Sequence, residues 1–504
     1  MTSSQPRRRR TRRAPIRTVG LRIRKLRRAR GLSPLELAQP EFTKKYLRTV
    51  ERCNIIPSLK VIELFARRLE VPVAQLLRAN VAQYTGSGLT SENDLGALQE
   101  DLNYQLNYAK MLIKDGNLEE ALECIRLAEM YVASTGPHAA KLPPRLLYRL
   151  PFLKGLAYLN SHNSDAALPE LERALSLVEA DEEKAATVHN VLGAAYYLKE
   201  RPDLAIKEHL ICLRAVQNNT LRDLSSRFSV YRNLANDYFA LGDAKQAIAI
   251  YKFTLPLLQD LNDPVRKAAV FFSMGIAYWE IKDKISSILY SSRARELWLE
   301  IGDRIEVAKT SLNIGEMLLD DRRPKEAEPF LQEASNILLD PENSADDQLL
   351  NHLYKVLALS AFKQGFLEKA EEHVQISLNF GKAASLAAVD ACACLADSYE
   401  DSDKKIRPGS ACYPICAYVD SLHLAAQIAQ ARGRTDVVDE IFATALEWAE
   451  KTGSQETIHS VSLGYAQNME ERGAHQPAMT YYKAAAEANL PLKRKNVGRS
   501  VLVG

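Results

Sequence analysis

The chain has 504 residues, of which 46% are hydrophobic and 26% are charged, a composition typical of a folded protein. One hydrophobic core rarely serves a chain of this length, so we expect at least two domains. No apolar run approaches the roughly 18 residues of a membrane-spanning helix, and the amino terminus has no apolar secretory segment. The seven cysteines follow no disulfide-framework spacing. We therefore expect a cytoplasmic protein without a membrane partner.

Positive charge is concentrated near the amino terminus. Residues 1–80 hold 21 Lys and Arg against 5 Asp and Glu, a net charge of +16, whereas the rest of the chain carries −13. Such a division indicates that one segment meets a polyanion and the other does not. Residues 1–16 are rich in arginine and predict a disordered basic arm. On DNA this arm either enters a minor groove or stays a solvated tail that strengthens non-specific binding.

Residues 17–80 predict five short helices. The first carries apolar residues at three- and four-residue spacing and ends at Gly31. Its polar face holds Arg22, Arg24, Lys25, Arg27, Arg28 and Arg30. Ser33 and Glu36 form a capping box for a second helix that ends near Ala38. Thr43 is the expected N-cap of a third helix that reaches about Arg52. A fourth helix is expected to begin at residues 57–58, and a fifth to begin at residues 71–72 and reach residue 77.

The order and spacing of these helices resemble the Xre/lambda-repressor family of helix-turn-helix regulators. The residues that carry the resemblance are Ile23, Leu26, Gly31, Leu32, Ser33, Leu37, Ala38, Leu47, Val50, Glu51, Arg52, Pro57, Ser58, Leu59, Ala66 and Leu69. In that family the third helix enters the major groove of double-stranded DNA. The resemblance implies DNA contacts from Arg22, Thr43, Lys44, Lys45, Tyr46, Arg48 and Thr49. Arg48 is the strongest candidate for a base contact, because a guanidinium binds guanine bidentately. The alternative is that these residues form an ordinary solvated helix face.

Residues 81–97 predict a linker, and residues 98–490 contain an internal repeat, with a tail at 491–504. Each repeat has a small residue, an apolar or aromatic residue three positions later, and another small residue nine positions further on, as in Gly155, Tyr158 and Ala167. The last of these positions recurs with a period near 40, at residues 121, 167, 205, 247, 287, 327, 370, 438 and 478. The gap from 370 to 438 predicts an irregular insert around residues 401–413. The pattern resembles about nine tetratricopeptide repeats, which are pairs of helices stacked into a superhelix. The expected fold class is therefore all-α.

The first helix of each such repeat faces a concave groove. Asn107, Asn233 and Asn313 recur at the same position of three repeats, and an asparagine amide both donates to and accepts from a peptide backbone. We expect the ligand surface to comprise Asn190, Arg232, Asn233, Asn236, Phe272, Trp279, Asn313 and Lys355. The alternative is that the asparagines only bridge neighbouring helices.

The segments around Asn233 and Asn313 are similar to peptide-holding helices of the Rap, Rgg, NprR, PlcR and PrgX group of regulators. This resemblance implies a regulator that binds a peptide or protein in its repeats and double-stranded DNA through its basic domain, as a homodimer. A second hypothesis is a scaffold that a basic domain tethers to nucleic acid without sequence choice. A third is a repeat protein that sequesters another regulator.

The sequence offers little support for catalysis. It contains no Walker loop, metal-binding His-Glu-x-x-His helix or Gly-x-Ser-x-Gly nucleophile motif. Cys392, Cys394, Cys412 and Cys416, with His423 nearby, match no zinc-site spacing, and free cysteines commonly fill helix interfaces. We expect no enzyme activity, cofactor or metal.

Overall fold

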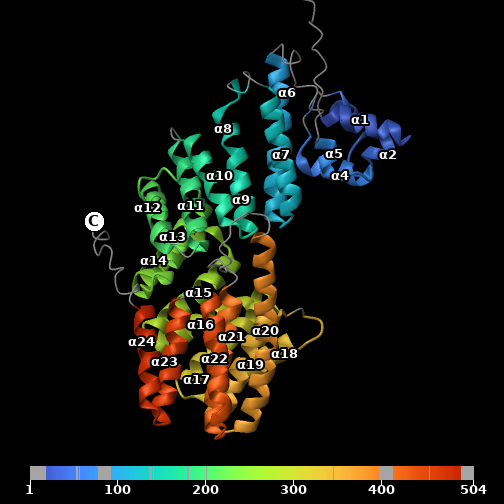
Figure 1. The fold of residues 1–504 in the computed structure, drawn as a ribbon. Coiled ribbons are helices and arrows are strands. Elements are labelled where there is room, and N and C mark those ends of the chain that lie inside the picture. The colour runs from blue at the N-terminus through green and yellow to red at the C-terminus, as the bar shows by residue number, and fades with distance from the viewer. Residues whose placement is uncertain are drawn as a thin grey trace, which may run out of the picture. The chain divides into compact units, whose positions relative to one another are not determined.

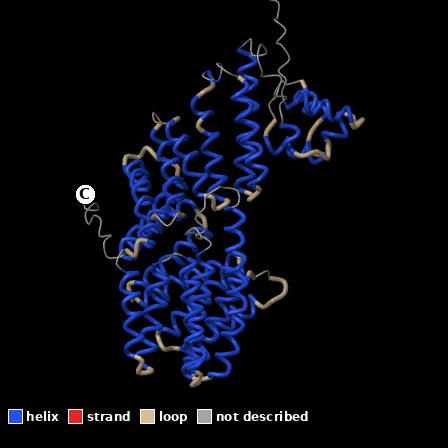
Figure 2. The backbone as a smooth tube through the Cα atoms, viewed as in Figure 1, coloured by secondary structure: helices blue, strands red, loops and turns tan. Residues whose placement is uncertain are grey.

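The computed structural model describes residues 19–52, 55, 57–77, 92–135, 139, 141–178, 181–199, 201–343, 345–396, 412–452 and 455–489. Over these residues the chain consists of helices joined by loops, without a strand, as Figure 2 shows. The all-α prediction is therefore confirmed. None of the described helices is both long and apolar enough to cross a membrane. The predicted basic arm, residues 81–91 of the predicted linker and the tail lie outside the described residues. Residues 92–97, predicted as the end of the linker, instead form the first turns of a helix that begins at Glu92.

The five predicted amino-terminal helices are all present: α1 (Val19–Ala29), α2 (Pro34–Ala38), α3 (Lys44–Glu51), α4 (Leu59–Arg68) and α5 (Val73–Leu77). Gly31, two residues after the end of α1, has a φ of +70°, a backbone conformation that favours glycine. Both bonds of the predicted capping box at Ser33 and Glu36 are formed. Thr43 caps α3 by accepting a hydrogen bond from the backbone N–H of Tyr46. Local cap chemistry thus sets where these helices begin.

A buried ion pair joins α1 to α3. The Nε of Arg27 lies 2.5 Å from one carboxylate oxygen of Glu51, and its Nη2 lies 3.0 Å from the other. Arg27 also donates to the carbonyl of Leu32 at 2.6 Å. The two side chains are only 8% and 6% exposed, so the position of Arg27 on the polar face of α1 was wrongly predicted. The pair instead fixes α3 against the core of this domain.

The rest of the described chain forms nine successive helix pairs, with one short extra helix, α8 (Pro144–Leu147), between the first and second pair. The pairs are α6 (Glu92–Lys114) with α7 (Leu118–Ser134), α9 (Arg149–Asn160) with α10 (Ser164–Ser176), α11 (Glu182–Leu198) with α12 (Pro202–Gln217), α13 (Leu224–Ala240) with α14 (Ala244–Leu261), α15 (Pro264–Glu280) with α16 (Lys284–Ile301), α17 (Arg304–Asp320) with α18 (Pro324–Leu338), α19 (Asp347–Lys363) with α20 (Leu367–Ala396), α21 (Cys412–Ala431) with α22 (Thr435–Thr452), and α23 (Gln455–Glu471) with α24 (His475–Asn489) (Figure 1). These bounds match the predicted tetratricopeptide-like repeats. The long gap in the repeat spacing falls at the 30-residue helix α20 and at residues outside the described part of the chain.

The repeated small residues allow the two helices of a pair to approach closely. A Cβ atom added to Gly155 would lie 2.7 Å from Leu171, and one added to Gly315 would lie 2.4 Å from the same position of a later repeat, Leu331. The aromatic position packs beside this contact, as where Tyr278 stacks on Tyr290 at 5.2 Å between ring centres. Replacement of these glycines would therefore force the helix pairs apart.

The chain divides into two compact units. Unit 1 comprises residues 1–195 and 211–221, and unit 2 comprises residues 196–210 and 222–504. Unit 1 thus contains the amino-terminal helices together with the first repeats. Its core is continuous from Ile23 on α1 to Leu98, Leu102 and Leu106 on α6.

Polar contacts reinforce this attachment of the amino-terminal helices to α6. Arg22 on α1 lies 2.8 Å from a carboxylate oxygen of Asp101, whose side chain is only 2% exposed. The same guanidinium donates to the carbonyl of Leu76 at 2.6 Å. One turn after Asp101, the Tyr104 hydroxyl donates to the carbonyl of Pro57 at 2.5 Å. The amino-terminal helices are therefore docked on the first repeat helix.

The buried Arg27–Glu51 pair leads to a stability prediction. Replacement of Glu51 by Ala leaves the Arg27 charge buried without a partner, which costs about 3–5 kcal/mol. Amide hydrogen exchange measured by mass spectrometry should accelerate strongly in α1 and α3 of the full chain and not in unit 2. The double variant Arg27→Met/Glu51→Leu removes both charges and should restore most of the protection. Equal exchange in the single variant and the wild type would contradict this account.

Candidate nucleic-acid and ligand-binding surfaces

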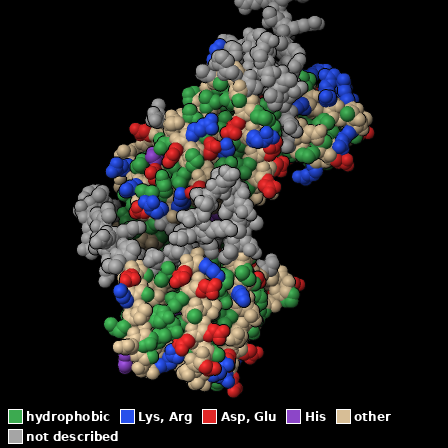
Figure 3. Space-filling view, in the orientation of Figure 1, with side chains coloured by type: hydrophobic (Ala, Val, Ile, Leu, Met, Phe, Trp, Pro, Cys, Tyr) green, Lys and Arg blue, Asp and Glu red, His purple; other side chains and the backbone are tan. Residues whose placement is uncertain are grey.

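The predicted DNA-reading helix presents cations at the surface. Lys44, Lys45 and Arg48 on α3 are exposed, and none of them forms an ion pair with another described residue. Leu47 and Val50, on the opposite side of α3, are fully buried. Figure 3 shows Lys and Arg side chains gathered on the amino-terminal helices. The core contacts therefore turn the basic side of α3 outwards.

The other predicted readers on α3 have structural contacts as well. Tyr46 stacks on Phe42, with 4.8 Å between the ring centres, and remains half-buried. The Thr49 hydroxyl donates to the carbonyl of Lys45 at 2.7 Å, and Thr43 serves as the helix cap. Arg22 is different, because its guanidinium is occupied by Asp101 and Leu76. The structure thus brings together all the predicted readers except Arg22.

The predicted ligand surface of unit 2 begins on α13 and α15. Arg232 is exposed and donates to the side-chain oxygen of its neighbour Asn233 at 3.1 Å. The guanidinium carbons of Arg232 and Arg266 lie 5.9 and 5.3 Å from the ring centre of Phe228. Surrounding protein and the charge of Arg266 lower the pKa of Arg232. Two first helices of successive repeats therefore present guanidinium groups around one ring.

The remaining predicted positions of unit 2 differ in their surroundings. Asn236 accepts a hydrogen bond from the Tyr251 hydroxyl at 2.5 Å, so it bridges the helices of its own pair. Phe272, Trp279 and Asn313 are partly exposed on α15 and α17. Asn236 thus connects two helices, as the alternative to a ligand contact expects, whereas Phe272, Trp279 and Asn313 reach the surface.

Lys355 belongs to a charged cluster that the sequence pattern did not indicate. Its ammonium group lies 3.1 Å from Glu316 on α17, and His352 Nε2 lies 3.1 Å from the other carboxylate oxygen. Burial would raise the pKa of Glu316, but the charge of Lys355 and the hydrogen bond of His352 outweigh it and hold this pKa well below its usual value. Burial raises the pKa of Asp420 on α21, and Lys355 opposes this shift. The cluster therefore spans the first helices of three successive repeats.

His209 on α12 forms a buried pair with Asp237 on α13. Its Nδ1 lies 2.5 Å from Asp237, and both side chains are at most 1% exposed. Burial raises the pKa of Asp237, and the contact with His209 opposes that shift. The pair connects α12 to α13 within unit 2 and has a structural role.

In unit 1 the first helices of two repeats line a pocket of about 450 Å³. Asn107, one of the three recurring asparagines, is among the residues that line it, with Lys110 and Lys114 further along α6. Asn190 on α11 is partly exposed and has interactions of its own. The sequence pattern did not indicate the pocket, because its two walls, α6 and α9, are separated in the chain by α7 and α8.

Among the described residues no group of three or more His, Cys, Asp or Glu side chains is arranged to hold a metal ion. Of the four cysteines near His423, only the side chain of Cys416 is described, and its Sγ lies 3.2 Å from the Thr457 hydroxyl. Cys392, Cys394 and Cys412 carry side chains outside the described part of the structure. The His423 ring instead packs against Gly464, where an added Cβ would lie 2.2 Å from the imidazole.

No protein-family model and no curated protein sequence matches the chain. Among solved structures, PlcR of Bacillus thuringiensis in complex with the peptide PapR7 and DNA is 14% identical, with a TM-score of 0.33, and the match covers 56% of this chain and 95% of that one. A Rap protein complexed with Competence and Sporulation Factor is 13% identical, with a TM-score of 0.45 and coverage of 78% and 97%. The apo form of the quorum sensor NprR from B. thuringiensis is 12% identical, with a TM-score of 0.44 and coverage of 77% and 88%.

The Glu316 cluster leads to a pH prediction. A carboxyl group whose pKa is lowered by folding stabilises the folded protein when the pH is above the pKa of that group in the unfolded chain. This contribution is lost progressively as the pH falls below that value. The usual value for Glu316 is 4.5, so the wild type should be more stable than Glu316→Gln above about pH 5, and the difference should shrink below pH 4.5. All three tryptophans lie in unit 2, so intrinsic fluorescence during thermal unfolding reports this unit.

The exposed Glu300 on α16 provides a control, since Glu300→Gln should change the unfolding temperature little at any pH. A constant difference between the wild type and Glu316→Gln from pH 7 to pH 3 would contradict the assigned pKa direction.

Proposed function

We propose that the chain is a transcriptional regulator that binds double-stranded DNA through α3 and a peptide or protein ligand through the first helices of its repeats. The DNA-binding half of the proposal rests on the exposed cations of α3, which have no carboxylate partner among the described residues. Elsewhere in this domain Arg22, Arg27 and Arg68 are each paired with a carboxylate. Lys44, Lys45 and Arg48 have no such partner among the described residues, and a phosphate backbone supplies the missing anions.

Rigid support favours sequence-specific reading over a loose electrostatic tether. The Arg27–Glu51 pair and the buried Leu47 and Val50 fix the orientation of α3. A preorganised helix can place Arg48 against a base edge with little further loss of conformational freedom. On α1, the exposed Lys25 and Arg28 are suited to phosphate contacts. Because regulators of this kind read two-fold operators, the proposal includes a homodimer.

For the ligand, the surface of α13, α15 and α17 offers groups that suit a peptide. Asn233 and Asn313 present amides at equivalent repeat positions, and Trp279 adds a partly exposed aromatic ring. A bound ligand changes DNA affinity only to the extent that it binds the DNA-competent and incompetent states differently. Such a ligand would act on the spacing of the two basic domains in the dimer.

The DNA-binding proposal is tested by selecting genomic DNA fragments with the purified chain at near-physiological salt. The wild type should enrich a few two-fold-symmetric sites. Replacement of Lys45 and Arg48 by Ala should weaken binding to these sites by about 1–3 kcal/mol per lost base contact, or roughly 5- to 150-fold for Arg48 alone. Lys245→Ala/Lys252→Ala, which removes two exposed charges from α14, is the matched control and should keep the selection. Uniform recovery of all fragments, unchanged in the α3 variant, would instead support the non-specific scaffold.

The ligand proposal is tested with peptides selected from a random library on the immobilised chain. Asn233→Ala should weaken the selected peptides by about 1–3 kcal/mol, because a peptide backbone group loses its partner in a desolvated site. Fluorescence anisotropy measures the affinity, with Gln259→Ala at an exposed position of α14 as a control for the loss of an amide. Unchanged affinity in Asn233→Ala and Asn313→Ala alike would rule out this surface.

A further inference from the structure

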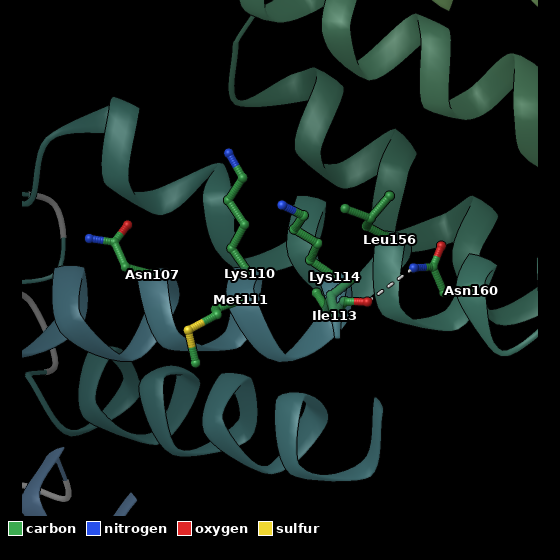
Figure 4. A pocket seen from close by; sticks show the side chains of 7 residues that line it. All are labelled: Asn107, Lys110, Met111, Ile113, Lys114, Leu156 and Asn160. Atoms are coloured by element: carbon green, nitrogen blue, oxygen red, sulfur yellow. Dashed lines mark hydrogen bonds between the residues drawn. The ribbon is translucent and has the colours of Figure 1, made fainter. Parts of the chain in front are cut away.

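The pocket of unit 1 has an unusual set of lining groups. Lys110 and Lys114 project from one side of α6, and Leu156 and Asn160 face it from α9, where Asn160 donates to the carbonyl of Ile113 at 3.5 Å (Figure 4). The volume, about 450 Å³, lies within the range of small-ligand sites. Both lysines are exposed, and neither forms an ion pair with a described residue.

A third cation borders the pocket and is held by neutral groups alone. Arg149 on α9 donates to the side-chain oxygen of Asn107 at 2.7 Å and to that of Asn103 at 3.2 Å. Burial lowers the pKa of its guanidinium, and no described carboxylate lies within ion-pair distance of it. Lys110 and Lys114 line the pocket, and Arg149 reaches Asn107 at its edge, without a counter-charge from any described residue. A bound anion would supply that counter-charge.

We propose that this pocket binds an acidic peptide segment. Two lysines one helical turn apart suit carboxylates that are spaced along an extended chain, and the Asn107 and Asn160 amides suit its backbone. The side chains of Met111 and Leu156 give the pocket an apolar part. Nucleic acid would gain little from such apolar groups, whereas a peptide with alternating acidic and apolar side chains satisfies both kinds of contact.

The position of the pocket also gives the ligand a route to the DNA-binding helices. Asp101 and Tyr104 contact the amino-terminal domain from α6, while Asn107, Lys110 and Lys114 of the same helix line the pocket. An acidic ligand on α6 therefore contacts the element to which α1 is ion-paired. This regulatory part rests on the proposed function, whereas the binding site itself does not.

The site is tested with a hexapeptide of alternating glutamate and leucine, labelled with fluorescein at its amino terminus and amidated at its carboxyl terminus, against the full chain. The same peptide with glutamine in place of glutamate is the matched ligand. The glutamate peptide should bind more tightly, and Lys110→Gln/Lys114→Gln should weaken it by about tenfold or more, as expected for the loss of two charge-assisted contacts. Lys245→Gln/Lys252→Gln, which removes the same charge from α14, should leave the affinity unchanged, and circular dichroism verifies the fold of each variant.

Equal binding of the two peptides, or equal loss in the two lysine variants, would overturn the proposal. Displacement of the peptide by millimolar inorganic phosphate alone would also overturn it, because the site would then hold any small anion. The DNA selection on the Lys110→Gln/Lys114→Gln variant separates the two proposals. If this variant selects the same operators but no longer binds the peptide, the proposed function and the peptide pocket are both supported. If the wild type selects no operator, only the proposed function fails.

Discussion

The ion pair between Arg22 and Asp101 joins the two kinds of structure in unit 1, a basic helical domain and a stack of helix pairs. A carboxylate that is only 2% exposed on α6 would be costly without a partner, and Arg22 supplies the charge and a second bond to Leu76. The apolar residues Leu98, Leu102 and Leu106 then extend the core of the basic domain into the first repeat. The basic domain is consequently part of a larger folding unit. The core that supports α3 includes residues of α6 as well as those of α1 to α5.

Much of the fold follows from local sequence signals. Ser33, Glu36 and Thr43 cap their helices through bonds to residues three positions away, and such short-range chemistry can be recognised in the sequence. The recurring small residues likewise predict the helix pairs, because Gly155 and Gly315 leave room for a leucine of the partner helix at equivalent positions. These features depend on spacing within one repeat or one turn, so the sequence was sufficient to predict them.

The roles of individual charges could not be predicted in the same way. Arg22, Arg27 and Arg28 look alike in the sequence, yet Arg22 pairs with a residue 79 positions away and Arg27 with one 24 positions away, while Arg28 stays exposed. The same holds for Lys355, whose partner Glu316 lies on an earlier repeat. Helical periodicity tells which side of a helix is polar, but only the tertiary arrangement decides which polar groups neutralise one another. The candidate sites are therefore defined by the cations that remain unpaired after folding.

Helix α6 serves two surfaces, and its composition suggests how they are coupled. The Gln105 side chain, one turn after Asp101 on the same side, is fully buried, and neither its oxygen nor its nitrogen is hydrogen-bonded to a described residue. Burial of an unpaired amide costs about 1–3 kcal/mol, so the packing of α6 is less stable than its leucines alone would make it. Packing that includes a destabilising group is easier to shift between two arrangements than fully apolar packing. Under the proposed function, a ligand that binds the outer side of α6 therefore needs only a modest difference in affinity to change how firmly helices α1 to α5 are held.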